Sequence, residues 1–266
     1  MIKDVSFFGA GNVAWHLAQM LYDAGVNINT VYSRHKENAV KLAQKTGAVA
    51  IDRIEEMPCG AGLYIFALND DAVKGVAERF ARVCGGDMPV VHTGGMLDSD
   101  IFKPRYKQYG CFYPLQTFKK EKPLFNKDFP VFITSSNADF GKALYRLSRM
   151  ISGNVHYIED DKRKVLHVAA VFVNNFTNYL LSIAAKITAE EGLQLEYLLP
   201  LLRETVDKVA NGGDPALLQT GPAVRGDSKT MEAHLDFLKK YPQFQKVYDI
   251  LSRGIQDEKD TDFNTK

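Results

Sequence analysis

Small residues follow the first apolar segment of the chain in a pattern suited to binding phosphate groups. The segment 5–8 leads directly into Gly9, Ala10, Gly11, Asn12, Val13 and Ala14. Gly9 can make a tight strand-to-helix turn, Gly11 lets the backbone approach a pyrophosphate, and Ala14 keeps helix and sheet close. The helix expected over 15–24 offers free N–H groups and a partial positive charge at its N-terminus. The pattern predicts a dinucleotide site, with an ordinary turn of small residues as the alternative.

Hydroxyl and basic side chains end the second expected strand, residues 28–32. Where a site for NAD would place an acidic residue against the ribose hydroxyls, this chain has Ser33 and Arg34. Arg34 can hold a 2′-phosphate in a planar fork, and Ser33 can add a hydroxyl donor. We therefore expect NADP as the cofactor. In the alternative interpretation, residues 34–36 are the solvated start of a helix.

Short polar loops follow the fourth and fifth expected strands. Ligands of open parallel sheets gather at the carboxyl ends of the strands, so we expect contacts with the cofactor from Leu68, Asn69, Thr93 and Gly94. His92 can bind substrate or act as an acid, because the titration range of histidine suits proton transfer near neutral pH. Alternatively, His92 is a loop histidine that bonds to the backbone.

Two other segments combine polar and apolar residues. In 113–118, two aromatic residues accompany Gln116 and Thr117, which suits either the wall of a pocket beside a nicotinamide ring or a buried crossover. His167, Asn174 and Asn178 share one face of a long expected helix. Polar groups on an apolar face need partners, so these three point either to a cleft between domains or to a structural hydrogen-bond network.

The loop 220–230 contains Gly and Pro residues around Arg225. Arg225 can bind an anionic substrate or form an ion pair. Asp227 or Ser228 can cap the helix that follows, which needs nothing beyond local structure.

The elements that position these residues alternate between strand and helix. Strands are expected over 5–8, 28–32, 48–51, 62–68, 89–92, 110–112, 129–134 and 155–158, with helices over 15–24, 36–46, 70–83 and 137–152. This α/β alternation predicts a Rossmann-type, doubly wound, mostly parallel sheet in a domain of residues 1–158. Residues 159–266 are expected to form an all-helical dimerisation and substrate domain, with helices over 160–192, 196–211, 229–239 and 242–257 and a fraying polar tail.

Composition excludes several classes of protein. The 266 residues are 45% hydrophobic with a net charge of +1 and scattered basic residues, which argues against a nucleic-acid surface. The three cysteines lack the spacing of a metal site, and their odd number gives no sign of an oxidising compartment. The N-terminus begins with an expected strand rather than a signal peptide, so we expect the cytoplasm. The apolar segment 165–185 contains a histidine and three asparagines, which are costly in lipid. We therefore expect a buried helix rather than a membrane span.

The ordered motifs GAGNVA, SR, HTGG, YPLQTF, VNNF and GPAVRGD resemble those of bacterial Rossmann-like proteins named as NADP oxidoreductases. Their helical C-terminal domain is catalogued as a domain of unknown function, and the resemblance covers nearly the whole chain. More distantly, the chain is similar to pyrroline-5-carboxylate reductase, to deazaflavin-dependent NADP reductases and to the 6-phosphogluconate dehydrogenase superfamily. The resemblance implies a Rossmann domain followed by a helical domain that often dimerises, and hence a homodimer.

One residue departs from the pattern of that superfamily. The β-hydroxyacid dehydrogenase branch has a catalytic lysine three residues before an asparagine, and here Val171 precedes Asn174. That chemistry does not carry over, whereas reduction of an imine mainly needs orientation in a polar cleft.

We therefore expect a cytoplasmic NADP-dependent oxidoreductase that transfers hydride between nicotinamide and a small carbonyl or imine compound between its domains. His92, Thr117, His167 and Asn174 are the candidate catalytic residues, and Gln116, Asn178 and Arg225 the candidate substrate contacts. A regulatory or sensor protein that binds NADP without turnover is one alternative, and an interaction module with a vestigial site is another.

Overall fold

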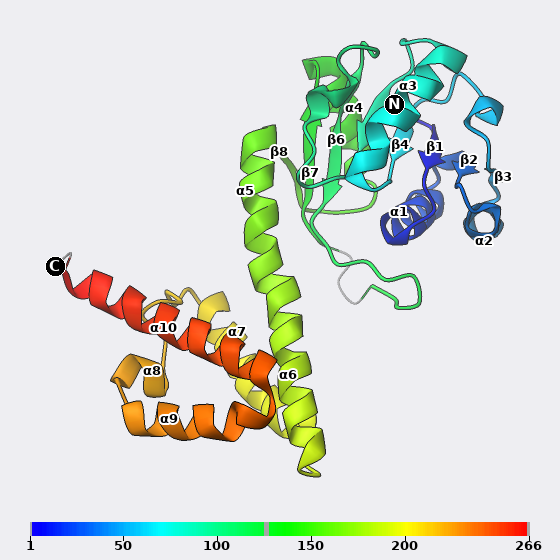
Figure 1. Cartoon of the computed structure of the whole chain (residues 1–266). Helices are drawn as coiled ribbons and strands as arrows, with labels where there is room; N and C mark the ends of the chain where they lie inside the picture. The colour runs from blue at the N-terminus through cyan, green and yellow to red at the C-terminus, as the bar shows by residue number, and fades with distance from the viewer. Residues whose placement is uncertain (1, 125–127, 265–266) are drawn as a thin grey trace. The chain divides into compact units, whose positions relative to one another are not determined.

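Strands and helices alternate through the first part of the chain, as the sequence predicts (Figure 1). The computed structural model describes residues 2–124 and 128–264, and the side chains of these residues as far as 259. The strands are β1 (Asp4–Phe8), β2 (Asn27–Tyr32), β3 (Val49–Ile51), β4 (Tyr64–Phe66), β5 (Val90–His92), β6 (Tyr109–Pro114), β7 (Val131–Ser135) and β8 (Val155–Tyr157). The α-helices between them are α1 (Asn12–Asp23), α2 (Lys36–Thr46), α3 (Asp70–Cys84) and α4 (Ala138–Ser148), with short 3-10 helices η1 (Ile54–Glu56) and η2 (Ser99–Phe102).

All eight strands form one sheet in the order β3-β2-β1-β4-β5-β6-β7-β8. Neighbouring strands are parallel except β6 and β7, which are antiparallel. The expected doubly wound, mostly parallel sheet is therefore confirmed. The carboxyl ends of β1, β2, β4, β5 and β6 meet at one edge, which is where ligands bind in open sheets of this kind.

Each face of the sheet is covered by its own apolar core. On one face, α1, α2 and α4 pack on β-strand side chains such as Phe7 and Ile65, which are fully buried. On the other face, α3 and η2 pack on Phe8, Tyr64 and Phe66. Coverage on both faces explains why the central strands have continuous apolar runs instead of alternating ones.

Helix boundaries follow local signals in the sequence. Helix α2 begins and ends at the expected residues. Its end is set by Gly47, which adopts the left-handed conformation, with a φ of 68°, that ends a helix without steric cost. Helix α4 is capped by Asn137, whose side-chain oxygen accepts a hydrogen bond from the Phe140 N–H over 2.9 Å.

The remainder of the described chain is helical. Its elements are α5 (Asp160–Ala170), the π-helix η3 (Val171–Phe176), α6 (Thr177–Glu190), η4 (Leu195–Leu198), α7 (Leu199–Ala210), α8 (Pro222–Arg225), α9 (Ser228–Phe237), η5 (Leu238–Lys240) and α10 (Pro242–Asn264). The chain divides into two compact units, Met1–Asn175 and Phe176–Lys266, so α5 belongs to the first unit although the last strand ends at Tyr157. Helix α10 includes the expected polar tail from Glu258 as far as Asn264, and the fraying of that tail stays a prediction; residues 265 and 266 lie outside the described part.

The long helix over residues 160–190 differs from its expected environment. We expected it to be buried, but several of its apolar side chains are exposed, with exposed fractions of 68% for Val165 and 76% for Val173. Length and composition alone would allow this helix to cross a membrane, and one such helix is weak evidence for a span. The apolar residues of a helix indicate that one of its faces is buried, but they do not identify the surface that buries it.

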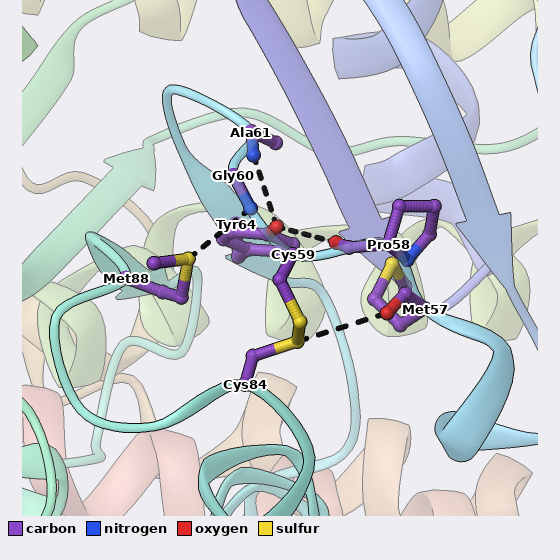
Figure 2. The surroundings of a disulfide bond; sticks show 8 residues. All are labelled: Met57, Pro58, Cys59, Gly60, Ala61, Tyr64, Cys84 and Met88. Atoms are coloured by element: carbon purple, nitrogen blue, oxygen red, sulfur yellow. Dashed lines mark hydrogen bonds between the residues drawn. A yellow bond between two sulfur atoms is a disulfide. The ribbon is translucent and has the colours of Figure 1, made fainter.

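Two of the three cysteines form a disulfide, Cys59–Cys84, with their Cα atoms 5.4 Å apart (Figure 2). Cys84 is the last residue of α3, and Cys59 lies in the loop before β4. Buried Tyr64 fixes this loop, because its hydroxyl donates to the Pro58 carbonyl over 2.6 Å and accepts from the Ala61 N–H over 3.0 Å. Cysteine usage therefore gives no support to the expected reducing compartment, since only Cys111 is a free, buried thiol.

Thiol titration tests this pairing. We expect one reactive thiol per chain in denaturant without reductant, from Cys111, and three after reduction. Because the bond closes a loop with a sequence separation of 25, we expect its reduction to lower the free energy of unfolding by about 3 kcal/mol. The double variant Cys59→Ser/Cys84→Ser is the control, since reductant should not change its stability. Three reactive thiols before reduction would contradict the pairing.

Candidate functional site

The turn between β1 and α1 requires a glycine at its first position. Gly9 has a φ of 112°, and a Cβ there would lie 2.2 Å from the Ala67 carbonyl oxygen at the end of β4. Its N–H donates to the Tyr32 carbonyl over 2.8 Å, which joins the turn to the end of β2 as well. The turn is therefore fixed against the two strands that flank β1.

At Gly11, by contrast, neither the backbone conformation nor the space around it requires a glycine. Its φ is −76°, which any residue adopts, and a Cβ there would meet nothing within 4 Å. Gly11 is the N-cap residue of α1, so the free N–H groups of that helix begin beside it. The fold itself does not require this glycine, and the space it leaves open is available to a ligand.

A first cavity of about 470 Å³ surrounds this turn. The expected cofactor residues that line it come from the ends of three strands: Gly9, Ala10, Gly11, Ser33, Arg34, Leu68 and Asn69. The charged side chains along its wall are mostly cationic, with Arg34, Arg79 and Lys120 opposite one acid, Asp71. A positive cavity at a helix N-terminus suits a phosphorylated ligand.

Two of these cations already have partners, and Arg34 does not form an ion pair with any residue in the described part of the chain. Arg79 pairs with Glu55 over 2.7 Å, which lowers the pKa of that carboxyl through a hydrogen bond. The Lys120 ammonium lies 5.7 Å from the centre of the Trp15 ring. Exposed Arg34 is therefore the cation best placed to bind an added anion.

A second cavity, of about 600 Å³, is lined only by residues of the first unit. Val13 on α1 lines it two residues after Gly11, so the two cavities lie on either side of the start of that helix. The other sequence-predicted residues in its wall are Thr93, Gln116, Thr117, His167 and Asn174. Their side chains come from the loop after β5, from the segment after β6 and from the helix that starts at Asp160.

A pair of side chains in this second cavity forms a direct hydrogen bond. The Tyr113 hydroxyl lies 2.8 Å from His167 Nδ1, and the two rings pack edge to face with their centres 5.8 Å apart. Tyr113 is 7% exposed, and burial raises the pKa of its hydroxyl to about 12. A Cβ on Gly95 would lie 2.3 Å from His167 Nδ1, so the glycine at 95 leaves the room that this ring occupies.

A buried ion pair positions the helix that carries His167. The Arg163 guanidinium is fully buried, pairs with Asp160, and donates to the Leu97 carbonyl and to the Thr134 hydroxyl. Asp160 also accepts hydrogen bonds from the N–H and hydroxyl of Ser99, over 2.8 and 2.7 Å. Burial alone would raise the pKa of Asp160, but these hydrogen bonds and the Arg163 charge lower it below its usual value.

His92 lies away from both cavities. It is fully buried at the end of β5, its Nδ1 accepts a hydrogen bond from the Gly94 N–H over 3.1 Å, and its Nε2 has no partner among the described residues. Burial, together with the charge of Arg163, lowers the pKa of His92 to about 3. Its ring is therefore neutral at ordinary pH and shapes the loop 93–95.

The remaining predicted residues do not line either cavity. Asn12 accepts a hydrogen bond from the Lys120 N–H over 3.3 Å, and Gly94 is held by His92. Asn178 on α6 and Arg225, the last residue of α8, belong to the second unit. Asp227 caps α9 as expected, accepting from the Thr230 N–H over 3.2 Å.

Sequence reasoning did not single out Tyr113 as a reactive group. It interpreted 113–118 as a pocket wall or a buried crossover, although Tyr113 is near the carboxyl end of a strand parallel to β5, where other site residues were sought. The Asp160–Arg163 pair was also missed, because acidic residues in a first turn usually stabilise a helix without any distant partner.

Comparison with known proteins gives relatives of the whole chain. A model of a domain of unknown function, DUF2520, matches residues 129–255, which include β7, α4 and β8 as well as the helical part. A solved structure named as an NADP oxidoreductase from Bacteroides fragilis is 36% identical, covers 96% of this chain and 98% of its own, and superposes with a TM-score of 0.90. No curated protein matches.

Two more distant structures share the fold. Plasmodium falciparum pyrroline carboxylate reductase with NADP bound is 12% identical over 95% of this chain and 98% of its own, with a TM-score of 0.60. An imine reductase from Myxococcus stipitatus in complex with NADP⁺ is 13% identical over 96% and 93%, with a TM-score of 0.65. Because a relative at 36% identity spans nearly the whole length, this chain belongs to the same protein family as the Bacteroides fragilis protein.

Proposed function

We propose that the protein is an NADP-dependent oxidoreductase that transfers hydride between nicotinamide and a small carbonyl or imine compound. The observation that carries the proposal is that Gly11 and Arg34, from two different strand ends, line one positive cavity. The name of the 36% identical relative, an NADP oxidoreductase, supports it.

The first cavity suits the phosphorylated part of a dinucleotide, including a 2′-phosphate. A Cβ on Gly11 would project into open space, which a pyrophosphate beside the N–H groups of α1 would fill. Arg34 can bind the 2′-phosphate with two parallel hydrogen bonds, and Ser33, whose Oγ accepts from the His35 N–H over 3.3 Å, can donate its hydroxyl hydrogen. We assign Leu68 and Asn69, at the end of β4, to the wall beside the rest of the nucleotide.

The second cavity is the proposed reaction site. When bound, the cofactor supplies a hydride donor or acceptor. Thr117, His167 and Asn174 line this cavity and can orient a carbonyl or imine by hydrogen bonds. Val171 also lines it where the related dehydrogenase branch has lysine, so that branch's acid–base chemistry is not assigned here. An NADP sensor without turnover is the second candidate, and Val171 is the observation that favours it.

We also propose that the protein is a homodimer. Val165, Val168 and Val173 expose large apolar surfaces on the helix over 160–190, and such surfaces usually mark a partner. In a two-fold dimer the same patch faces itself, and an apolar patch is complementary to its own copy. A second copy of the chain is therefore the occupant we assign to this face.

Replacing Arg34 tests the proposed phosphate contact. We expect Arg34→Ala to weaken NADPH binding by roughly 10- to 100-fold, because a hydrogen-bonded charge pair contributes about 1.5–3 kcal/mol, and to leave NADH binding unchanged. Isothermal titration with both nucleotides measures this, and Arg82→Ala, an exposed arginine of α3 outside the cavity, is the matched control. Failure of the wild-type protein to bind NADPH would contradict the proposed function, and equal losses for both nucleotides would contradict the role of Arg34.

The two glycines of the turn are expected to respond differently to alanine. Gly11→Ala should change the unfolding free energy by about 1 kcal/mol or less and weaken NADPH binding at least tenfold, since its Cβ meets only ligand space. Gly9→Ala should lower stability by about 3 kcal/mol or more, because its φ and the Ala67 carbonyl exclude a side chain. Denaturant unfolding and nucleotide titration check both, with Gly254→Ala in α10 as control. Wild-type affinity in Gly11→Ala would refute the ligand contact.

Sedimentation velocity tests the dimer. We expect the wild-type chain to sediment at twice the mass of one chain, and Val165→Glu/Val173→Glu to sediment as a monomer because two buried charges would oppose association. Val49→Glu on the edge strand β3 changes an equally exposed valine and should leave the dimer intact. A monomeric wild-type protein at micromolar concentration would rule out this use of the apolar face.

A further inference from the structure

The second cavity contains one hydroxyl that is both nearly buried and bonded to a histidine, namely that of Tyr113. Building on the proposed function, we infer that Tyr113 is the catalytic acid–base residue, with His167 as its proton relay, and that the substrate is an uncharged ketone or aldehyde. The inference rests on the Tyr113–His167 geometry and on the charges that line the cavity.

The lining of the second cavity selects for a neutral ligand. Among its described lining residues there is no Asp, Glu, Lys or Arg. A bound carboxylate would need a cation in this wall, where the one described side chain that can become cationic, His167, is already bonded to Tyr113. A bound iminium would need an anion, because a charge removed from water without a partner is strongly disfavoured. Apolar residues such as Leu115, Leu166 and Val171 supply much of the remaining surface.

Tyr113 is held firmly enough to act as a positioned acid. It is near the end of β6, where the antiparallel partner residue is Phe132 of β7, and its ring packs against the His167 ring. The bond of 2.8 Å to Nδ1 leaves the phenol oxygen close to the cavity that both residues line. His167 is only half-buried, so it can exchange protons with water.

Two features set the position of His167. Gly95 leaves the room for its ring, and Arg163, one helical turn earlier, fixes α5 through the Leu97 carbonyl and Asp160. The contacts of Gly95 and Arg163 therefore keep the His167 ring within hydrogen-bond distance of the Tyr113 hydroxyl.

These groups account for every atom in a carbonyl reduction. The carbonyl carbon accepts the hydride that NADPH supplies, the electrons of the C=O π bond move to oxygen, and that oxygen takes the Tyr113 proton to give the alcohol. The phenolate oxygen then takes the proton that His167 carries on Nδ1 while a solvent proton reaches the other ring nitrogen, so that the imidazole stays neutral and the net reaction consumes one proton from solvent. The substrate gains two electrons and the nicotinamide is oxidised.

A neutral phenol suits a carbonyl better than an iminium. Burial keeps the Tyr113 hydroxyl protonated at neutral pH, since it raises the pKa to about 12. The alkoxide formed from a ketone is a stronger base than a phenolate, so it takes this proton readily. An iminium becomes a neutral amine on gaining hydride and needs no acid in that step, and this cavity offers it no carboxylate.

The experiment follows NADPH absorbance with matched probe substrates and the full-length protein. The neutral probes are cyclohexanone and benzaldehyde, the carboxylate probe is 2-oxobutanoate, and the imine probe is 2-methyl-1-pyrroline. We expect kcat/KM for the better neutral probe to exceed that for each of the other two by at least about tenfold, the discrimination that one unpaired group commonly gives. Preference for the oxo acid or the imine, or no reduction of either neutral probe, would overturn the substrate class.

Variants test the role of Tyr113 with the better neutral probe. Tyr113→Phe is expected to lower kcat by roughly 100-fold or more, as removal of a general acid does, while its NADPH affinity stays at the wild-type value. Tyr109→Phe removes a hydroxyl of the same strand that bonds Asp100 over 3.0 Å, and should leave turnover unchanged. His167→Ala is expected to lose turnover that added imidazole partly restores, which a purely structural histidine would not show.

The outcomes separate this inference from the proposed function. A wild-type protein that does not bind NADPH would contradict the proposed function itself. NADPH binding with Tyr113→Phe turnover close to wild type would overturn only the role of Tyr113. Loss in His167→Ala without rescue by imidazole would overturn the relay.

Discussion

The buried Arg163 guanidinium determines where the second cavity has its polar groups. Arg163 joins α5 to the 93–99 loop through the Leu97 carbonyl, to β7 through Thr134, and to its own helix through Asp160. Removing one member of such a buried pair typically costs about 3–5 kcal/mol, because the other charge is left without a partner. Since His167 is one turn further along α5, the same contacts that stabilise the helix bring its imidazole to Tyr113.

Charge distinguishes the two cavities although both border the start of α1. Among the charged side chains in the wall of the first cavity, cationic ones predominate. The polar groups in the described wall of the second cavity are hydroxyl, amide and imidazole groups, and this wall contains no Asp, Glu, Lys or Arg. For electrostatic reasons alone, the first cavity would favour the phosphates of a ligand and the second cavity its neutral reacting group. Under the proposed function, this separation would let the phosphorylated end of the cofactor bind in the first cavity while its nicotinamide reaches the second.

Local signals in the sequence were sufficient for much of the fold and for the first cavity. The end of α2 follows from Gly47, and the turn at Gly9 follows from small residues between a strand and a helix. The first cavity was predictable because parallel strands bring Gly11 and Arg34 to one edge, whatever the details of packing.

Features that depend on distant contacts were not predictable in the same way. The Cys59–Cys84 bond joins residues with a separation of 25, and the burial of His92 depends on side chains from several elements. Antiparallel pairing of β6 with β7 has no local signature in the apolar pattern. The apolar pattern over 160–190 predicts a buried helix, whereas several of its apolar side chains, such as Val165 and Val173, are exposed among the described residues.

Thermal unfolding with NADPH, with NADH and without nucleotide tests the central claim most directly. A ligand that binds only the folded state adds about 2.7 kcal/mol at 100 times its dissociation constant, which is a measurable rise in melting temperature. The site at Gly11, Ser33 and Arg34 predicts a clear rise with NADPH and a much smaller one with NADH at equal concentration. No rise with either nucleotide, or an equal rise with both, would contradict a 2′-phosphate site in the first cavity.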